Sequence, residues 1–155
     1  MSANNHDDVV IRRATASDLA AIVALLADDE IGVGRESPDD LTPYQRTFEV
    51  IESDQHELLM VAERNGGIIG TLQLSLLPGL SRRGAFRAQI EGVRVAGSER
   101  GNALGAYLIE WAINEARSWG CQSVQLTSDK TRVDAHRFYE RVGFTATHEG
   151  FKLML

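Results

Sequence analysis

The sequence has little of what marks a secreted or membrane-spanning protein. A single cysteine, Cys121, excludes an internal disulfide and fits a reducing compartment. No apolar run approaches the ~20 residues that a membrane-spanning helix needs. Residues 1–8 lack the basic and apolar stretches of a secretory signal. We therefore expect a cytoplasmic protein with no membrane partner.

Positive charge is also scarce. The chain has 16 Lys and Arg against 22 Asp and Glu, a formal net charge of −6. Binding to nucleic acid is driven by basic side chains that neutralise phosphates, so this balance argues against a nucleic-acid partner. We expect no metal cofactor either.

The length of 155 residues predicts one domain, 1–155, with residues 1–7 as a disordered N-terminus. Apolar periodicity and turn residues predict an α/β fold: a mixed, twisted sheet of about six to seven strands with helices on both faces. Asn65-Gly66 between two apolar runs predicts a tight hairpin. Helices are expected to begin near residues 15, 42, 102 and 131. Strands are expected at 9–13, 57–63, 68–77, 86–95, 121–127, 144–148 and 151–155.

Residues 93–105 carry the strongest motif: an apolar strand pattern ends at Val95, a small-residue loop follows, and a long amphipathic helix pattern begins. The N-terminus of a helix offers unpaired N–H groups and partial positive charge, which together bind phosphate. Arg100 adds a cation with a forked donor set. Two other phosphate-binding motifs do not match this sequence. The nucleoside-triphosphate loop needs Lys and then Ser or Thr after its second glycine, which Gly105 lacks, and no spacing of the glycines satisfies the dinucleotide fingerprint Gly-x-Gly-x-x-Gly.

The run Arg100-Gly101-Asn102-Ala103-Leu104-Gly105 instead follows Arg/Gln-x-x-Gly-x-Gly/Ala, except that Ala103 stands at the first small-residue position. With the preceding Val93-Arg94-Val95, it resembles the acetyl-coenzyme A signature of the GNAT N-acetyltransferase superfamily. A downstream segment, 134–144, resembles the family's C-terminal helix ending in Gly-Phe. The resemblance covers essentially the whole chain and implies the GNAT fold, in which acetyl-CoA wedges between two splayed central strands.

The resemblance also implies which residues bind the cofactor. The backbones of Val93 and Val95 would pair with the pantetheine arm, and the loop and first helical turn would surround the pyrophosphate. Asp134 and Phe138 would lie near the cofactor from the C-terminal helix. The expected pyrophosphate residues are Arg100, Gly101, Asn102, Ala103, Leu104, Gly105 and Ala106.

Acyl transfer to an amine needs a base, an oxyanion site and a proton for the departing thiolate. Glu91 is the candidate base, in a strand of small and apolar groups that we expect to desolvate it and raise its pKa; an ion-paired or substrate-binding role, or a water as base, stays open. Gly92 is expected to allow a bulge that frees a backbone N–H. Tyr139 is the candidate acid, by resemblance. Cys121 is interpreted as a core residue, which favours direct attack by the amine.

The predicted activity is acetyl transfer from acetyl-CoA to a primary amine of a small molecule. Acetylation of a protein N-terminus or lysine, and a non-catalytic acyl-CoA-binding module, remain alternatives. The acceptor pocket is expected from residues 28–56, 78–87 and the last hairpin. Six acidic residues within 28–40 form either a solvated loop or an acidic lip for a cationic amine. The apolar tail 151–155 predicts an edge strand that pairs in a homodimer.

Overall fold

A computed structural model describes residues 6–155. The chain divides into two compact units, one up to Gln125 and one from Leu126 to Leu155, and each is described by itself. The expected disorder of residues 1–5 lies outside the described residues. His6 and Asp7 are described: the His6 ring stacks on Tyr107 with centroids 4.9 Å apart, and Asp7 lies in a turn.

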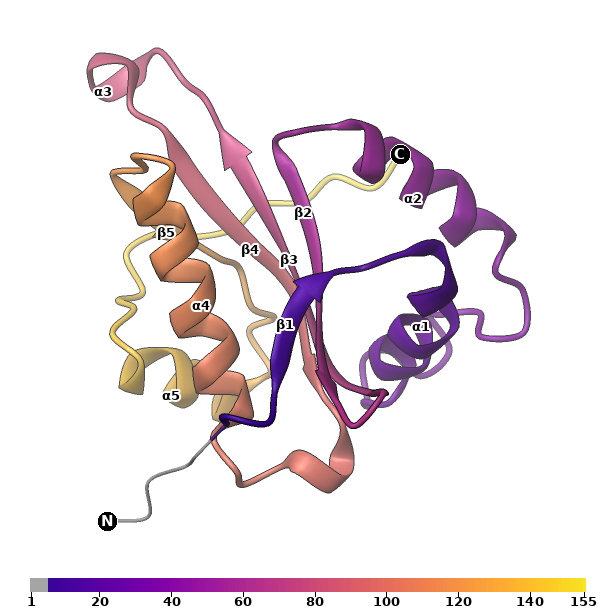
Figure 1. The fold of residues 1–155 in the computed structure, drawn as a ribbon. Helices are drawn as coiled ribbons and strands as arrows, with labels where there is room; N and C mark the ends of the chain where they lie inside the picture. The colour runs from indigo at the N-terminus through magenta and orange to yellow at the C-terminus, as the bar shows by residue number, and fades with distance from the viewer. Residues whose placement is uncertain (1–5) are drawn as a thin grey trace. The chain divides into compact units, whose positions relative to one another are not determined.

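The larger unit contains a five-stranded mixed sheet, which confirms the α/β fold class (Figure 1). The strands follow the order β1-β2-β3-β4-β5, with antiparallel pairs throughout except for the parallel pair β4–β5. At the β2–β3 turn, Asn65 and Gly66 both take positive φ, 51° and 80°, as the hairpin motif predicts. The strands are β1 Val10–Arg13, β2 Glu57–Arg64, β3 Gly67–Leu77, β4 Arg87–Val95 and β5 Ser123–Gln125.

Helices pack on both faces of this sheet. On one face lies α4 (Leu104–Ser118), and on the other lie α1 (Leu19–Ala27) and α2 (Thr42–Ser53) (Figure 1). Apolar side chains are buried on both faces: Ile22 and Val23 of α1 on one, and Leu108 of α4, which is fully buried, on the other. Gly70 on β3 permits this close packing, since a Cβ there would lie 3.0 Å from Leu108 Cδ1. The β3–β4 connection holds only the short turn α3 (Ser81–Gly84).

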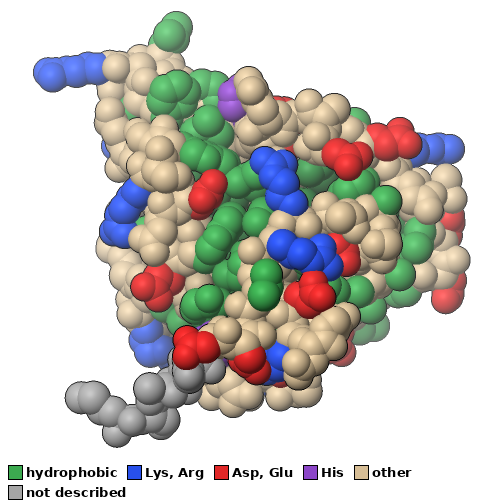
Figure 2. Space-filling view, in the orientation of Figure 1, with side chains coloured by type: hydrophobic (Ala, Val, Ile, Leu, Met, Phe, Trp, Pro, Cys, Tyr) green, Lys and Arg blue, Asp and Glu red, His purple; other side chains and the backbone are tan. Residues whose placement is uncertain are grey.

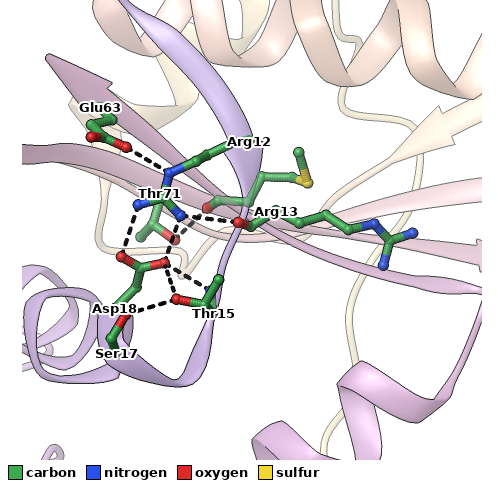
Figure 3. Close-up of polar contacts among 8 residues, drawn as sticks. Arg12, Arg13, Thr15, Ser17, Asp18, Glu63 and Thr71 are labelled. Atoms are coloured by element: carbon green, nitrogen blue, oxygen red, sulfur yellow. Dashed lines mark hydrogen bonds and ion pairs between the residues drawn. The ribbon is translucent and has the colours of Figure 1, made fainter. Parts of the chain in front are cut away.

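Arg12 on β1 ties the edge of the sheet to the start of α1 (Figure 3). Its guanidinium donates to both carboxylate oxygens of Asp18, at 2.7 and 3.0 Å, and to Glu63 on β2 at 2.6 Å. Asp18 ends the 3-10 turn η1 (Ala16–Asp18) and accepts the N–H of Thr15 at 2.8 Å, as in a capping box. The hydrogen bonds from Arg12 lower the pKa of the buried Asp18 carboxyl to about 2, against the cost of its burial.

The smaller unit contains the helix α5 (Val133–Arg141), followed by Gly143 at φ 104°. The strands expected at 144–148 and 151–155 are absent: within the described chain, no strand follows β5. The sheet of residues 6–155 therefore has five strands rather than six or seven. The tail residues Phe151, Leu153 and Leu155 are exposed, and the homodimer stays a prediction.

Basic and acidic side chains are interspersed on the face seen in Figure 2 rather than gathered in a patch of one sign. In the part of the chain from residue 6 onward, no helix is both long and apolar enough to cross a membrane.

We expect the Asp18→Asn variant to be less stable than the parent by about 2 kcal/mol at pH 7, because a folded-state pKa of about 2 lies nearly two units below the usual Asp value. The folded pKa is depressed, so this stability is complete above the unfolded-state pKa and is lost as the pH falls toward the folded one. The difference should shrink to about half by pH 3. Urea denaturation at both pH values measures it. Asp39→Asn, at an exposed carboxylate, is the matched control and should change stability at neither pH.

Candidate active site

The β5-facing edge of β4 is paired along only part of its length. Arg87, Ala88 and Gln89 pair with β5, and within the unit up to Gln125 no strand pairs with that edge beyond Gln89. The other edge of β4 remains paired with β3 as far as Val95. The parallel ladder therefore ends after three pairs, and within this unit the later β4 backbone has no strand partner on that edge. Backbone groups at such an edge can pair with an extended ligand as a strand would.

A bulge interrupts β4 at this separation, as the sequence predicts. Glu91 pairs with Gln73 and Arg94 pairs with Thr71, so β4 has one more residue than β3 between these pairs. Gly92 sits in this bulge at φ 61°, a conformation that glycine adopts without steric cost. The Glu91 side chain is exposed, so the expected partial burial of this carboxylate is wrong. It lies where the bulge begins and accepts a hydrogen bond from the Gln89 amide.

The loop after β4 leads into the N-terminus of α4 through a 3-10 turn, η2 (Gly97–Glu99). The N–H of Tyr107 donates to the Ala103 carbonyl at 3.0 Å and closes the first helical turn. The N–H groups of Leu104, Gly105 and Ala106 precede that bond, so no carbonyl one turn earlier can accept them. The predicted phosphate-binding residues therefore converge at the positive end of a 15-residue helix.

Two residues of this loop take left-handed conformations. Gly101 has φ 86°, with open space where a side chain would project. Ala103 has φ 57° at the N-cap of α4. This position is the one at which the motif has alanine in place of glycine. The left-handed region costs an L-residue roughly 1 kcal/mol or more, whereas glycine enters it freely. The departure from the motif is thus a source of backbone strain.

Glu99 fastens the loop to the sheet, a role that sequence reasoning missed. It is buried, and it accepts a hydrogen bond at 2.6 Å from Arg64, at the end of β2. This bond lowers the pKa of Glu99, with a further contribution from the Asn102 side chain. The one available signal was an acidic residue next to the motif, and its partner lies 35 residues away.

Two arginines of the motif contact the segment that follows α1. Arg94 forms an ion pair with Asp29 at 3.0 Å. Arg100 donates to the Asp28 carbonyl at 3.2 Å, while its guanidinium remains largely exposed. Glu36 accepts the Tyr44 hydroxyl, so several of the acidic side chains in 28–40 bind groups of their own chain. Asp28, Glu30, Asp39 and Asp40 are exposed, as the solvated loop predicts, and the acidic lip stays a prediction.

The remaining candidates lie in the smaller unit. Phe138 and Tyr139 on α5 meet edge to face, with ring centroids 5.2 Å apart, and Tyr139 contacts Phe144 in the same way at 6.0 Å. These ring contacts restrict the orientation of the tyrosine. Asp134 is fully exposed in the first turn of α5, 3.9 Å from Arg137.

Cys121 is half-buried just before β5, and burial raises the pKa of its thiol. A thiol with a raised pKa is a poor nucleophile near neutral pH. The residue is therefore half-buried rather than in the core as expected, and direct attack by the amine stays a prediction.

Comparison with known proteins identifies the class. The model of the acetyltransferase (GNAT) family matches residues 19–144, most of the chain. The chain belongs to this family, which indicates acyltransferase activity. It is 28% identical over 144 residues to the aminoalkylphosphonate N-acetyltransferase of Salmonella typhimurium strain LT2, covering 91% of this chain and 88% of the relative.

The chain is also similar to part of a second acetyltransferase and to nearly the whole of a solved structure. The glucosamine 6-phosphate N-acetyltransferase of Trypanosoma brucei brucei is 37% identical over 90 residues, which span 58% of this chain and 59% of that protein. A crystal structure of a transcriptional regulator from Bacillus halodurans C-125 is 44% identical, with a TM-score of 0.91 and coverage of 95% of this chain and 99% of its own.

We expect Ala103→Gly to stabilise the protein by up to about 1 kcal/mol, because it removes left-handed strain that exceeds the added chain entropy of glycine. Urea denaturation measures this gain. Ala24→Gly, at an exposed position inside α1, is the matched control and should lose about 1 kcal/mol. A loss of stability at both sites would contradict the strain that we assign to Ala103.

Proposed function

We propose that this protein transfers an acetyl group from acetyl-CoA to a primary amine of a small molecule. The observation that carries the proposal is the juxtaposition of an unpaired edge of β4 with a loop and helix N-terminus built to receive phosphate. Family membership supports it. The whole chain, 1–155, would act as one cytoplasmic catalytic domain and work as a homodimer.

In this proposal the cofactor lies along β4 and over the start of α4. The backbones of Val93 and Val95 pair with the pantetheine arm. Arg94 donates to the Val93 carbonyl at 2.9 Å, which steadies the strand at this point. Arg100 leaves the Asp28 carbonyl and donates to the pyrophosphate. The N–H groups of Gly101 and of the first helical turn donate to the same pyrophosphate. By the family resemblance, Asp134 and Phe138 on α5 would also contact the cofactor.

The amine attacks the thioester directly. An amine with a pKa near ~10.4 is protonated at pH 7, and freeing it costs about 4–5 kcal/mol. Glu91 takes this proton, either directly or through an ordered water. Its exposure suits a base that must exchange its proton with solvent after each turnover. A backbone N–H at the Gly92 bulge stabilises the tetrahedral oxyanion.

Tyr139 donates the proton that the departing thiolate takes up. A tyrosine hydroxyl carries a proton that it can donate to a departing thiolate. The ring contacts with Phe138 and Phe144 hold the side chain in one orientation. An acid held in this way loses less conformational entropy when the substrate binds.

We further propose that the acceptor carries a phosphate or phosphonate group. The names of both curated relatives combine an amine with such a group. The exposed Arg82 and Arg83, in the expected acceptor segment 78–87, offer cations that suit it.

A second candidate is a non-catalytic acyl-CoA-binding regulator, which the similarity to the B. halodurans transcriptional regulator favours. The net charge of −6 argues against direct contact with DNA.

A thiol-release assay tests these candidates together. We expect acetyl-CoA turnover with 2-aminoethylphosphonate or glucosamine 6-phosphate to exceed that with ethylamine or glucosamine by at least tenfold in kcat/KM, since the arginines contact only the phosphorylated amines. Aminoglycosides, polyamines and basic peptides complete the panel. Equal rates for each phosphorylated amine and its neutral partner would contradict the acceptor class. A rise in melting temperature with acetyl-CoA, but no thiol release with any amine, would support the regulator.

Glu91→Gln should lower kcat by about 10²–10⁴-fold, most strongly at low pH, because the variant depends on the amine that is already deprotonated in solution. Tyr139→Phe should lower kcat while leaving acetyl-CoA binding unchanged. Initial rates across pH 6–9 and calorimetric titration of acetyl-CoA measure both. Glu110→Gln, at an exposed position on α4, is the control for loss of a negative charge. An unchanged pH profile for Glu91→Gln would favour a water-only route.

A further inference from the structure

A chain of hydrogen bonds runs along one face of the sheet to Glu91. The Arg87 guanidinium donates to the side-chain carbonyl of Gln125 at 3.1 Å. The Gln125 amide donates to the side-chain carbonyl of Gln89 at 3.0 Å. The Gln89 amide then donates to Glu91 Oε1. Three side chains of β4 and one of β5 thus form a continuous sequence of donors and acceptors.

The two ends of this chain determine its direction. A guanidinium can only donate, so it must meet the oxygen of Gln125 and turns the NH₂ of that amide toward Gln89. An ionised carboxylate can only accept, so it must meet the NH₂ of Gln89. Both amide orientations therefore follow from the groups at the ends. Each bond also polarises the next, and the last one is charge-assisted, which makes it stronger than a bond between neutral groups.

The position of this series of hydrogen bonds follows from the strand geometry. Residues 87, 89 and 91 alternate on β4 and share one face, up to the bulge at Gly92. Gln89 pairs with Gln125 in the last rung of the parallel ladder, just before β4 and β5 separate. The series of hydrogen bonds therefore crosses from β5 to β4 at their last paired residues, Gln125 and Gln89. Its final bond runs from Gln89 to Glu91, the next residue of β4 whose side chain lies on the same face.

Other polar groups on this face have partners of their own. Gln73 is directly across from Glu91 in the β3–β4 register, yet its amide donates to Glu57 on β2 at 2.8 Å. Arg94 and Asp29 form an ion pair beyond the bulge. Gln73 is therefore an internal control for Gln89. It is also a glutamine and also adjacent to Glu91, but its amide binds Glu57 instead.

We propose that Arg87, Gln125 and Gln89 form a directed hydrogen-bond relay whose purpose is to hold the Glu91 carboxylate in the orientation that accepts a proton from the acceptor amine. This rests on the proposed function. Gln89 and Gln125 are positioning residues, because they act through Glu91. An exposed glutamate otherwise samples many rotamers, and the relay limits that freedom where the acceptor arrives.

Three variants separate the relay from a merely structural role. Gln89→Leu removes the donor to Glu91 and should lower kcat by about tenfold, with little change in the KM for acetyl-CoA. Gln125→Glu keeps the size of the side chain and the Arg87 contact but attracts the Gln89 NH₂ to itself, so the Gln89 oxygen turns toward Glu91. Gln125→Leu merely releases Gln89. We expect the isosteric Gln125→Glu to reduce kcat more than Gln125→Leu, an order that a packing role would reverse.

Double-mutant cycles in the thiol-release assay test the coupling to Glu91. Gln89→Leu should have no further effect on kcat in the Glu91→Gln background, whereas Gln73→Leu should have the same fractional effect in both backgrounds. Effects of Gln89→Leu and Glu91→Gln that multiply would overturn the proposal. So would a Gln125→Leu protein impaired as much as Gln125→Glu.

A second measurement is independent of turnover. In ¹H–¹⁵N spectra, Glu91→Gln should shift the side-chain NH₂ signals of Gln89 and, less strongly, those of Gln125, while leaving those of Gln73 in place. Unmoved Gln89 signals would overturn the relay even in an active enzyme. A lack of thiol release with every amine would contradict the proposed function, and coupled Gln89 signals in that same sample would still support the relay.

Discussion

The backbone of β4 must satisfy its hydrogen bonds on two edges, and within residues 6–125 a strand covers its full length on only one of them. β3 covers one edge as far as Val95, and β5 covers the other for three residues, as far as Gln89. Peptide groups at an unpaired edge need partners, and an extended ligand can supply them. The bulge at Gly92, the exposure of Glu91 and the separation of the parallel strands all lie at the point where this pairing stops.

Contacts from distant segments then hold the surroundings of that edge in place. Arg64 on β2 holds Glu99, and through it the loop that leads to α4. Arg94 and Arg100 bind the segment after α1. Arg12 joins that same helix to the sheet through Asp18. Each of these contacts pairs an arginine with a group from another element, so these four arginines connect elements of an otherwise acidic protein.

The local features of the fold were predictable because short segments encode them. The Asn65-Gly66 hairpin, the loop and helix after Val95, and the bulge at Gly92 depend on residues that are close together in the sequence. The prediction of strands at 144–148 and 151–155 was wrong because a strand depends on residues that are distant in the sequence. Apolar residues in that segment fit a strand, but a strand exists only when a neighbour accepts its backbone hydrogen bonds. Sequence pattern contains no information about that neighbour.

The candidate site divides in the same way. Glu91 and the residues from Arg100 to Ala106 could be named from the sequence, because a motif of fixed spacing lies on consecutive turns and strands. The burial expected for Glu91 was wrong, because small and apolar neighbours along a strand do not reveal where the adjacent strand ends. The Glu99–Arg64 contact and the bonds from Arg87 through Gln125 to Gln89 could not be found at all.

The sequence by itself determined the family, the class of fold and the position of the candidate phosphate-binding loop, since these depend on periodicity and on residues a few positions apart. Only the tertiary structure decided that Ala103 takes a left-handed conformation, that β5 pairs for three residues, and that Gln125 meets Gln89. The physical reason is the same in each case. Strand register and loop conformation are set by packing between elements. The register then determines which side chains from distant parts of the sequence lie next to one another.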